Sequence, residues 1–317
     1  MHETGCKPMA TGPVLESVPP VNVWILSNAD AGRSLSNDSL RELVRHAGHT
    51  VVGLISKGEE YARPPEHGVD LVVAAGGDGT VETAARLVAG TSIPLAILPL
   101  GTANNIATSL EIVADVPQLI SSWHRARRVP FDLGRARAGS NEWLVVEGVG
   151  GGLIPAGIAA ANRALESVDA HPAVEVNAAV GVFYQVLTKL KPVRMVVTID
   201  DLSITEELLM LEVLNIRLVG PNLLLAPDAS SSDGMFDVVL ATPAHRSELL
   251  EYLARRMRVP PAAGHDTVPR LTLPRYRGRH VRIESHEEMH IDDERVDVTY
   301  AGGLDIEITP GAVTVLM

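Results

Sequence analysis

Residues 71–88 read Leu-Val-Val-Ala-Ala-Gly-Gly-Asp-Gly-Thr-Val-Glu-Thr-Ala-Ala-Arg-Leu-Val, and this stretch decides the interpretation of the whole chain. Leu71–Ala75 is a continuous apolar run typical of a buried strand, and Thr80–Val88 is typical of a helix. The glycines of the turn Gly76–Thr80 let a ligand approach the backbone, and free N–H groups at the helix start attract an anion. Asp78 would repel a phosphate unless a cation or a transferable proton lay between them. The turn therefore predicts metal-assisted phosphate chemistry.

The first part of the chain alternates short apolar runs with helical segments. The expected strands are Val21–Ser27, Thr50–Ser56, Leu71–Ala75 and Ile93–Leu98, and the expected helices are Ser39–Ala47 and Thr80–Val88, with helical turns from Asn105. Nearly continuous apolar strands are typical of a parallel sheet that is covered on both faces. We expect an open α/β domain over residues 21–129, with ligands bound where strands end and helices begin. Residues 1–20 are expected to be a disordered tail.

Strand-like segments dominate beyond Arg128. The expected strands are Phe131–Arg137, Trp143–Gly148, Val193–Asp200, Leu208–Arg217, Phe236–Ala241, His280–Glu284 and Val296–Tyr300, and the expected helices are Ile154–Leu165, Val174–Leu190 and Ser247–Met257. This pattern predicts a mostly antiparallel, β-rich second domain over residues 130–304. Gly150–Gly152 is expected to be a flexible connection to the helix after it. The apolar segment 305–317 is expected to dock, with a return to the first domain as one option.

Composition narrows the function classes. The 317 residues carry a net charge of −12 and only 3% aromatic side chains, which argues against nucleic acid as a partner, because such surfaces need positive charge and stacking rings. The single cysteine, Cys6, is typical of a reducing compartment. The first twenty residues lack the apolar segment of a secretory signal, and no apolar run is long enough to span a membrane. We expect a cytoplasmic protein, with peripheral contact at the inner membrane surface left open.

Two further polar loops follow strands of the first domain. Pro99-Leu-Gly-Thr-Ala-Asn-Asn105 follows the fourth strand, and Asn28-Ala-Asp-Ala-Gly32 follows the first. Because the carboxyl ends of parallel strands meet at one edge of a sheet, we expect the three loops to converge. Gly76–Thr80 by itself could be only a tight strand-to-helix turn, so the two added loops strengthen the prediction of a phosphate site.

Together with motifs in the second domain, these loops resemble the pattern of the diacylglycerol kinase catalytic-domain family, in the bacterial soluble lipid kinase branch related to sphingosine and ceramide kinases. The matching segments are Asn28–Gly32, Gly76–Thr80, Pro99–Asn105, Asp132–Gly134, Pro227–Ala229, Asp233–Val238 and Asp292–Glu294. Gly76–Thr80 alone would not separate this family from NAD kinases or phosphofructokinases, whereas the loop 99–105 and the second-domain motifs do. The resemblance extends from about residue 21 onward and implies an NAD-kinase-like or diacylglycerol-kinase-like first domain.

The resemblance implies phosphorylation of a hydroxyl of diacylglycerol or a related lipid at a membrane surface, with ATP as co-substrate and Mg²⁺ as metal. By this similarity, the residues that contact the nucleotide or its phosphates are Asn28, Gly32, Gly76, Gly77, Gly79, Thr80, Gly101, Thr102 and Asn104. Asp78 would lie beside Mg²⁺ and the transferring phosphoryl group, and Glu294 would be the base for the lipid hydroxyl, with Asp292 beside it.

Asp228 and Asp233 correspond to the family's additional metal-binding loop, although on the residues alone they are most simply turn residues. The run Asp292–Arg295 is, on the same basis, most simply a solvated face. The chain departs from the family's pattern at several positions, Ala29, Ala31 and Ser232 among them. Asn105 stands where the family has an aspartate, which removes one carboxylate from the expected metal cluster. Glu82-Thr83 replaces Asn-Glu, and Asp293 replaces the glycine of Asp-Gly-Glu, so Asp293 would need a positive φ in an unchanged turn.

These departures keep a second hypothesis open, namely a nucleotide-binding regulatory protein without kinase activity. A third is a kinase of a soluble hydroxyl compound, because the sequence has no strong membrane anchor. An apolar tunnel between the domains would favour a lipid, and a small polar pocket would disfavour one. The sequence does not fix the oligomeric state, and a homodimer is compatible with it.

Overall fold

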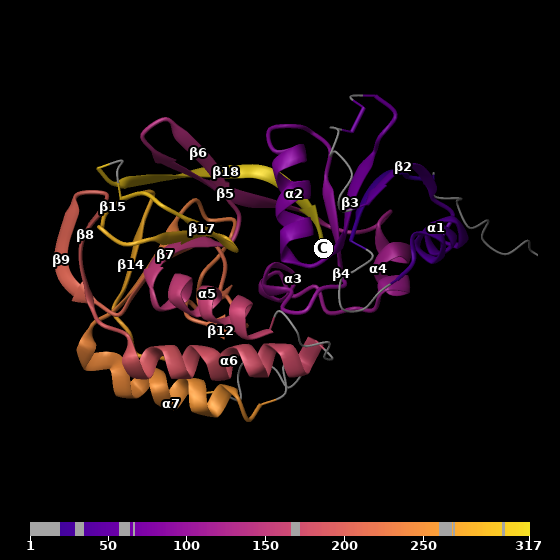
Figure 1. Cartoon of the computed structure of the whole chain (residues 1–317). Coiled ribbons are helices and arrows are strands. Elements are labelled where there is room, and N and C mark those ends of the chain that lie inside the picture. The colour runs from indigo at the N-terminus through magenta and orange to yellow at the C-terminus, as the bar shows by residue number, and fades with distance from the viewer. Residues whose placement is uncertain are drawn as a thin grey trace, which may run out of the picture.

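The computed structural model describes residues 20–28, 35–56, 64–65, 67–165, 172–259, 268, 270–299 and 302–317. The expected tail, apart from Pro20, and the candidate Gly32 lie outside these residues. Figure 1 shows two lobes side by side, with α2 and α3 of the first lobe facing the second lobe. The predicted class, a parallel α/β lobe followed by an antiparallel β-rich lobe, is confirmed.

The first lobe is a parallel sheet between two layers of helices. Its strands are β1 (Asn22–Ser27), β2 (Thr50–Ser56), β3 (Leu71–Gly76) and β4 (Leu95–Pro99), in the order β2-β1-β3-β4, and its helices are α1 (Asn37–His46), α2 (Asp78–Val88), α3 (Asn105–Ser109) and α4 (Val116–Ser122). Alternate strand residues point to opposite faces, so Leu26 and Val72 pack against α2 and α3, whereas Ile25 and Val73 pack against α1 and α4. Both faces are therefore apolar, as the sequence predicted.

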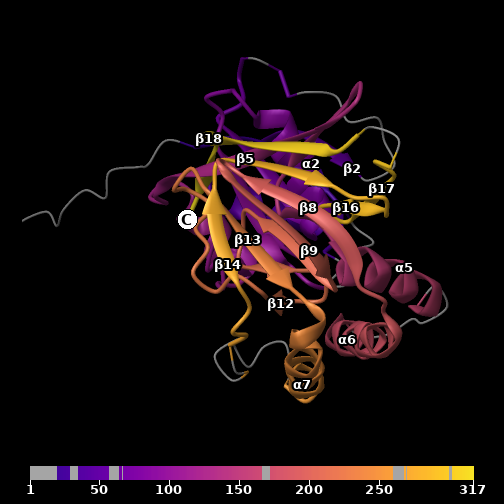
Figure 2. The ribbon, with the colours of Figure 1, turned by 90° about the vertical axis from the view of Figure 1, so that its left-hand side faces the viewer.

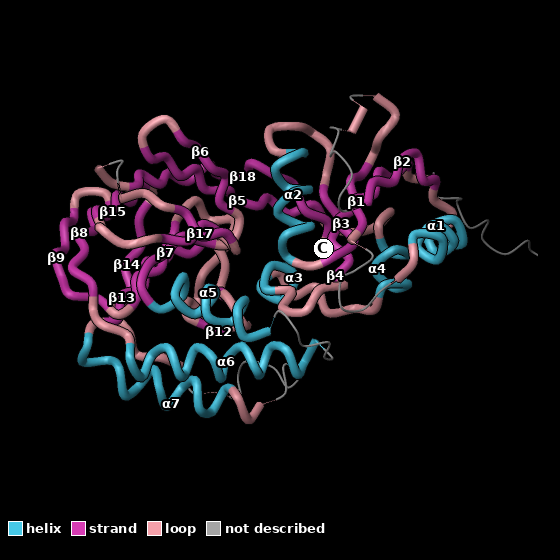
Figure 3. The backbone as a smooth tube through the Cα atoms, in the orientation of Figure 1, coloured by secondary structure: helices cyan, strands magenta, loops and turns pink. Residues whose placement is uncertain are grey.

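The second lobe is a sandwich with helices on one outer face (Figure 3). Its strands are β5 (Arg128–Ala138), β6 (Asn141–Val145), β7 (Gly148–Gly152), β8 (Val193–Ile199), β9 (Leu202–Leu208), β10 (Met210–Leu214), β11 (Leu218–Val219), β12 (Leu223–Leu224), β13 (Phe236–Ala241), β14 (Arg275–Gly278), β15 (His280–Glu284), β16 (Met289–Ile291), β17 (Glu294–Val296) and β18 (Leu304–Leu316). Its helices are α5 (Leu153–Leu165), α6 (Pro172–Lys189), the short 3₁₀ helix η1 (Pro243–His245) and α7 (Arg246–Arg256).

Two cores hold this lobe together. Within the described residues, one sheet has six strands in the order β14-β13-β10-β7-β16-β17. One face of it packs against the strands β5, β8, β15 and β18 through residues such as Phe236, Met289 and Ile306. The opposite face is covered by α5, α6 and α7 through residues such as Phe183 and Leu253. Figure 2 shows these helices beneath the stacked strands, with α6 and α7 adjacent.

Two long strands, β5 and β18, join the lobes. β18 pairs antiparallel with β15 in the second lobe, and near its end Val315 pairs in parallel with Leu95 of β4 in the first lobe. β5 follows β18 along its length, with a shift in register between Thr309 and Val313. The first-lobe strands are therefore continuous with a ten-stranded sheet, counted over the described residues, in which β18 lies beside β4.

Several element predictions for the second lobe were wrong. The expected strand Trp143–Gly148 is two strands, β6 and β7, separated by a bend at residues 146–147. Gly150–Gly152 is not a flexible connection, because it lies in β7 between β10 and β16. The last expected strand was Val296–Tyr300, whereas the strand observed here, β17, spans Glu294–Val296. Strand β9 went unpredicted because its sequence, Leu-Ser-Ile-Thr-Glu-Glu-Leu, is mostly exposed at a sheet edge.

Candidate active site

Two glycine-containing loops of the first lobe meet backbone to backbone. A Cβ atom built on Gly101 would lie 2.3 Å from Cα of Gly77, so no side chain fits between them. The N–H of Leu100 donates to the carbonyl of Gly76 at 2.9 Å, which ties the loops at their bases. Asn104, with φ of 52°, closes the second loop: its side chain accepts from the Gly101 N–H at 2.9 Å and donates to the Gly101 carbonyl at 2.8 Å. The predicted convergence of these two loops is thus present.

The first turn of α2 provides the expected anion-attracting groups. The helix starts at Asp78, two residues earlier than expected, and its N-cap Gly77 has no side chain to bond the first N–H groups. The first N–H groups of a helix have no partner within it, so they remain for a ligand. Gly79 is exposed here, whereas Thr80 is buried against Gly76. At the end of β1, the Asn28 N–H donates to the Ala75 carbonyl at 3.0 Å, which places Asn28 at the same edge, whereas residues 29–32 of the third expected loop lie outside the described residues.

Asp78 joins α2 to α3. Its Oδ1 accepts from the N–H of Ile106 at 3.0 Å, at the start of α3. Burial of the carboxyl group raises the pKa of Asp78, and repulsion from Asp293 adds to this, while the N–H groups of Ile106 and Asn105 act in the opposite direction. The Asp78 carboxylate therefore bonds the start of α3 and lies within the turn Gly76–Thr80.

The second lobe brings Asp293 to the exposed side of this turn. A Cβ atom built on Gly79 would lie 3.6 Å from Oδ2 of Asp293. Glu294 is exposed, and no hydrogen bond or ion pair of its side chain occurs among the described residues. The positive φ of this turn occurs at Asp292, where φ is 53°, and not at Asp293, where we expected it. The turn between β16 and β17 is therefore not the turn that the motif implied.

Asp292 is buried and holds the two lobes together. Its Oδ1 accepts from the backbone N–H groups of Val146, Glu147 and Gly148 at 2.8–3.2 Å, and Arg86 of α2 donates to its Oδ2 at 3.2 Å. Burial raises the pKa of Asp292 to about 6, although these hydrogen bonds and Arg86 favour the charged form. Asp292 thus shapes the bend between β6 and β7 and has no exposed oxygen for a substrate.

Two further buried carboxylates, Glu82 and Glu147, were not predicted as site residues. One oxygen of each has no hydrogen-bond partner among the described residues. Burial and repulsion from Asp292 and Asp293 raise the pKa of Glu82 to about 10. Burial, followed by repulsion from Asp78, raises the pKa of Glu147 well above its ordinary value. Glu147 follows an apolar run but belongs to no motif, so the sequence offered no signal for its place beside Asp78.

The two aspartates of the expected metal-binding loop are paired with arginines. Asp228 is exposed and contacts Arg270 and Arg275 at 3.2 Å each, and Asp233 contacts Arg277. No three His, Cys, Asp or Glu side chains of the described residues form a cluster suited to a metal. The described geometry of Asp228 and Asp233 is therefore that of surface ion pairs around a turn.

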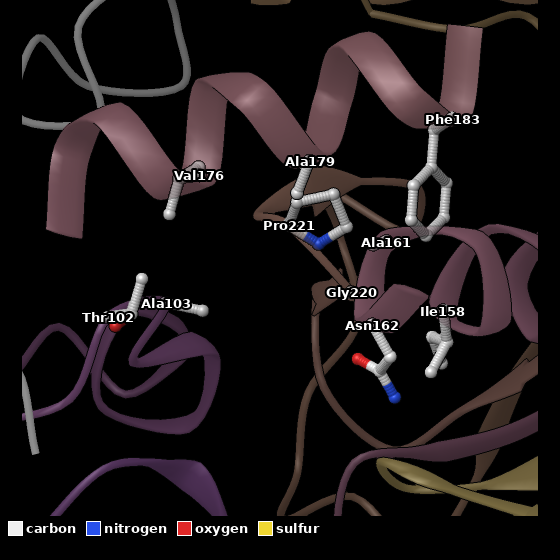
Figure 4. A pocket seen from close by; sticks show the side chains of 10 residues that line it. All are labelled: Thr102, Ala103, Ile158, Ala161, Asn162, Val176, Ala179, Phe183, Gly220 and Pro221. Atoms are coloured by element: carbon white, nitrogen blue, oxygen red, sulfur yellow. The ribbon is translucent and has the colours of Figure 1, made fainter. Parts of the chain in front are cut away.

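An apolar pocket of about 390 Å³ opens beside the second loop. Figure 4 shows Thr102 and Ala103 facing α6 across it, with α5 and the 220–221 segment on the far side. Its lining is Thr102, Ala103, Ile158, Ala161, Asn162, Val176, Ala179, Phe183, Gly220 and Pro221. Its size lies in the range of small-molecule sites, and Asn162 and Thr102 supply its polar side chains. The pocket can therefore receive an apolar group next to the loop that carries Thr102 and Ala103.

Within the described part of the chain, no helix combines the length and the hydrophobicity that crossing a membrane requires.

Comparison with known proteins gives matches over both lobes. Residues 22–136 match the family model of the diacylglycerol kinase catalytic domain, and residues 152–317 match that of the YegS C-terminal NAD kinase beta sandwich-like domain. A Stenotrophomonas maltophilia protein named "Probable lipid kinase YegS-like" is 27% identical, over 89% of this chain and 92% of its own length. A Mycobacterium tuberculosis diacylglycerol kinase is 27% identical, over 65% of this chain and 68% of its own length.

A solved structure shares the fold. The crystal structure of a diacylglycerol kinase from Bacillus anthracis superimposes with a TM-score of 0.67, covering 93% of this chain and 96% of that one, at 17% identity. This likeness extends over both lobes and agrees with the predicted architecture.

Proposed function

The chain belongs to the diacylglycerol kinase family and is thus a phosphotransferase with an alcohol acceptor, and from this premise we propose that it uses ATP and Mg²⁺ to phosphorylate a lipid hydroxyl at a membrane surface. The observation that carries the proposal is the contact of Gly77 with Gly101 directly beside the apolar pocket at Thr102. A phosphate-type site and an apolar acceptor site thus share one loop, as transfer to a lipid requires.

The nucleotide phosphates would lie at the start of α2 and along the loop 101–104. Backbone N–H groups and the helix dipole stabilise anionic phosphates there, and the missing side chains at Gly77 and Gly101 permit close approach. Phosphoryl transfer depends chiefly on positioning and charge neutralisation, so these loops would supply a large part of the catalysis.

The residues at this site fit a divalent cation. Mg²⁺ takes oxygen ligands and commonly uses one or two carboxylates together with phosphate oxygens and water, so a three-residue cage is not required. Asp78 offers a carboxylate at the turn, and Glu147 has a buried oxygen with no partner among the described residues. When bound, the cation would neutralise charge on the transferring phosphoryl group.

The acceptor chain would lie in the pocket between α5 and α6. Ala161, Ala179 and Phe183 give it apolar walls, and Asn162 can orient a polar group. The hydroxyl would then need a base from the second lobe. Asp293 lies nearest to Gly79 in the described geometry, while the motif favours Glu294, so the turn between β16 and β17 would supply this base.

The test is ATP turnover with diacylglycerol, a sphingosine-like lipid and phosphatidylglycerol in mixed vesicles, with glycerol as the soluble comparison. We expect turnover with at least one long-chain lipid and much less with glycerol. Ala179→Trp should fill the pocket and lower lipid turnover at least tenfold, whereas Ala178→Trp, on the exposed side of α6, should leave turnover near the wild-type value. Turnover of glycerol alone would support the soluble-substrate alternative, and ATP binding without turnover of any acceptor would contradict the proposal.

A further inference from the structure

Asn105 stands where the family's pattern has an aspartate, and it lies beside another carboxylate, that of Glu147. Asn105 is buried, and its Nδ2 lies 3.4 Å from Oε2 of Glu147. The same Nδ2 donates to the carbonyl of Gly220 at 2.9 Å, and Oδ1 of Asn105 accepts from Asn222 at 2.9 Å. These bonds fix the amide orientation, so the side chain that faces Glu147 is a neutral donor. An aspartate at this position would instead place two carboxylates in contact.

Glu147 is buried, and burial is unfavourable for a charged carboxylate that has no partner. Only 5% of the residue is exposed, and its Oε1 has no hydrogen-bond partner among the described residues. Among the described residues, Arg86 forms ion pairs with two other buried carboxylates, Glu82 at 3.7 Å and Asp292 at 3.2 Å. It forms no ion pair with Glu147. A buried carboxylate without a cation is costly, so this oxygen calls for a ligand.

The other charges around Glu147 point in the same direction. Asp78 and Glu147 both contact the start of α3: Oδ1 of Asp78 accepts from the Ile106 N–H at 3.0 Å, and Oε2 of Glu147 lies 3.4 Å from Nδ2 of the preceding residue, Asn105. After burial, repulsion from Asp78 contributes to the raised pKa of Glu147. Asp78 belongs to the phosphate-type turn, so Glu147 and this turn share one electrostatic environment. A divalent cation between Asp78 and Glu147 would relieve the repulsion and satisfy the unpartnered oxygen.

We propose that Glu147 supplies, from the bend between β6 and β7, the carboxylate that the family's pattern places at position 105, and that it holds the divalent cation together with Asp78. The exchange moves the acidic group from the start of α3 in the first lobe to the second lobe, where Oε2 of Glu147 lies 3.4 Å from the side chain of residue 105. Asn105 then serves as a positioning residue that orients Oε2 of Glu147 through its amide. This inference rests on the proposed function.

A protonated Glu147 is the simplest competing explanation. A neutral carboxyl group could remain buried there without any metal, and glutamine would imitate it almost perfectly in shape and charge. Glu147→Gln therefore separates the two explanations, because it should be silent if Glu147 is neutral and should weaken metal binding if Glu147 is a ligand.

The experiment measures binding of Mn²⁺, a paramagnetic substitute for Mg²⁺, by electron paramagnetic resonance with and without a non-hydrolysable ATP analogue. Thermal unfolding of each variant checks that it folds. Glu147→Gln should weaken Mn²⁺ binding at least tenfold, and the double variant Asn105→Asp/Glu147→Gln should recover most of that loss. Glu142→Gln is the matched control, since Glu142 is an exposed glutamate on the neighbouring β6 and should leave Mn²⁺ affinity unchanged. If Glu147→Gln does not fold, Glu147→Asp should fold and weaken Mn²⁺ binding several-fold.

Wild-type Mn²⁺ affinity in Glu147→Gln, or no recovery in the double variant, would overturn the inference even if lipid phosphorylation is robust. Wild-type protein that binds no Mn²⁺ would also overturn it. By contrast, Mn²⁺ binding that depends on Glu147 in a protein that turns over no lipid would support the metal site and count against the proposed function alone.

Discussion

Gly77 and Gly101, on two different loops of the first lobe, touch through their backbones: a Cβ on Gly101 would lie 2.3 Å from Cα of Gly77. The contact aligns the start of α2 with the loop that leads into α3. Each loop therefore depends on the other for its shape, and the proposed phosphate site is a property of the pair.

Gly101→Ala should disrupt this pair. The added methyl group cannot be accommodated without moving backbone, so we expect a loss of about 1–3 kcal/mol in the free energy of unfolding and at least tenfold weaker binding of an ATP analogue. Gly181→Ala in α6 is the matched control, because its Cβ would meet only Sδ of Met257 at 3.5 Å. It should be neutral or stabilising by up to about 1 kcal/mol. Isothermal titration and chemical denaturation measure both quantities, and equal effects of the two substitutions would contradict the prediction.

Asp78 should show separate structural and chemical roles. Asp78→Asn keeps an oxygen that can accept from Ile106 N–H and removes the charge that burial disfavours, so stability should hold or rise while turnover falls at least a hundredfold. Asp78→Ala also removes the hydrogen bond and should cost about 1 kcal/mol of stability in addition. Steady-state kinetics and thermal unfolding of the two variants provide the comparison. Wild-type turnover in Asp78→Asn would refute a chemical role for the carboxylate.

Asp293 and Glu294 are the two candidates for the proposed base. Both residues are exposed, but Asp293 lies beside Gly79, whereas no hydrogen bond or ion pair of the Glu294 side chain occurs among the described residues. Asp293→Asn should therefore lower kcat at least a hundredfold and Glu294→Gln less than tenfold. The pH dependence of kcat in each variant would show which substitution removes the limb that reports the base. The opposite order of effects would return the role to Glu294, as the motif implied.

The buried carboxylates should make metal-free stability fall with rising pH. The pKa of Asp292 is raised to about 6 and that of Glu82 to about 10, so the folded chain binds protons more tightly than the unfolded chain. Their stabilising contribution is complete below the unfolded pKa of about 4 and is lost as pH rises through about 6 for Asp292 and about 10 for Glu82. For Asp292 the loss is on the order of 3 kcal/mol.

Thermal unfolding between pH 5 and 9 in the presence of a chelator tests this dependence. Glu82→Gln should flatten the decline above pH 6, because glutamine does not titrate. Glu251→Gln removes an exposed ion pair with Arg255 on α7 and should leave the pH profile parallel to that of the wild type, with a change of no more than about 1 kcal/mol. Parallel profiles for Glu82→Gln and the wild type would contradict the assigned pKa of Glu82.

Elements whose signals are local could be predicted from the sequence. Leu71–Gly76 is apolar on both faces, and the glycines after it mark the start of α2, so this unit was predicted to within two residues. β7 escaped prediction because Gly148–Gly152 resembles a loop. Its backbone is a strand partly because Gly150 leaves room for the buried side chain of Glu212, which a Cβ would meet at 2.1 Å. That reason lies on another strand and is invisible in the local sequence.

The geometry of the candidate site was predictable in the first lobe and less so in the second. Gly77, Asp78 and Gly101 belong to motifs whose geometry is set by neighbouring residues. The place of Asp293 depends on which residue of its turn takes the positive φ, and the structure assigns that conformation to Asp292. Glu147 reaches the cluster through the packing of lobes far apart in sequence, and no pattern along the chain encodes that contact.

The pairing of Leu95 with Val315 has a consequence for how the chain folds. The partners are separated by more than two-thirds of the sequence, and β5 and β18 carry the same long-range pairing through both lobes. Contacts between distant segments form slowly, because a long loop must be closed before they stabilise anything. The β4 edge therefore stays open to other strands until this late pairing occurs. Refolding should accordingly show one slow phase shared by both lobes, with aggregation competing during it.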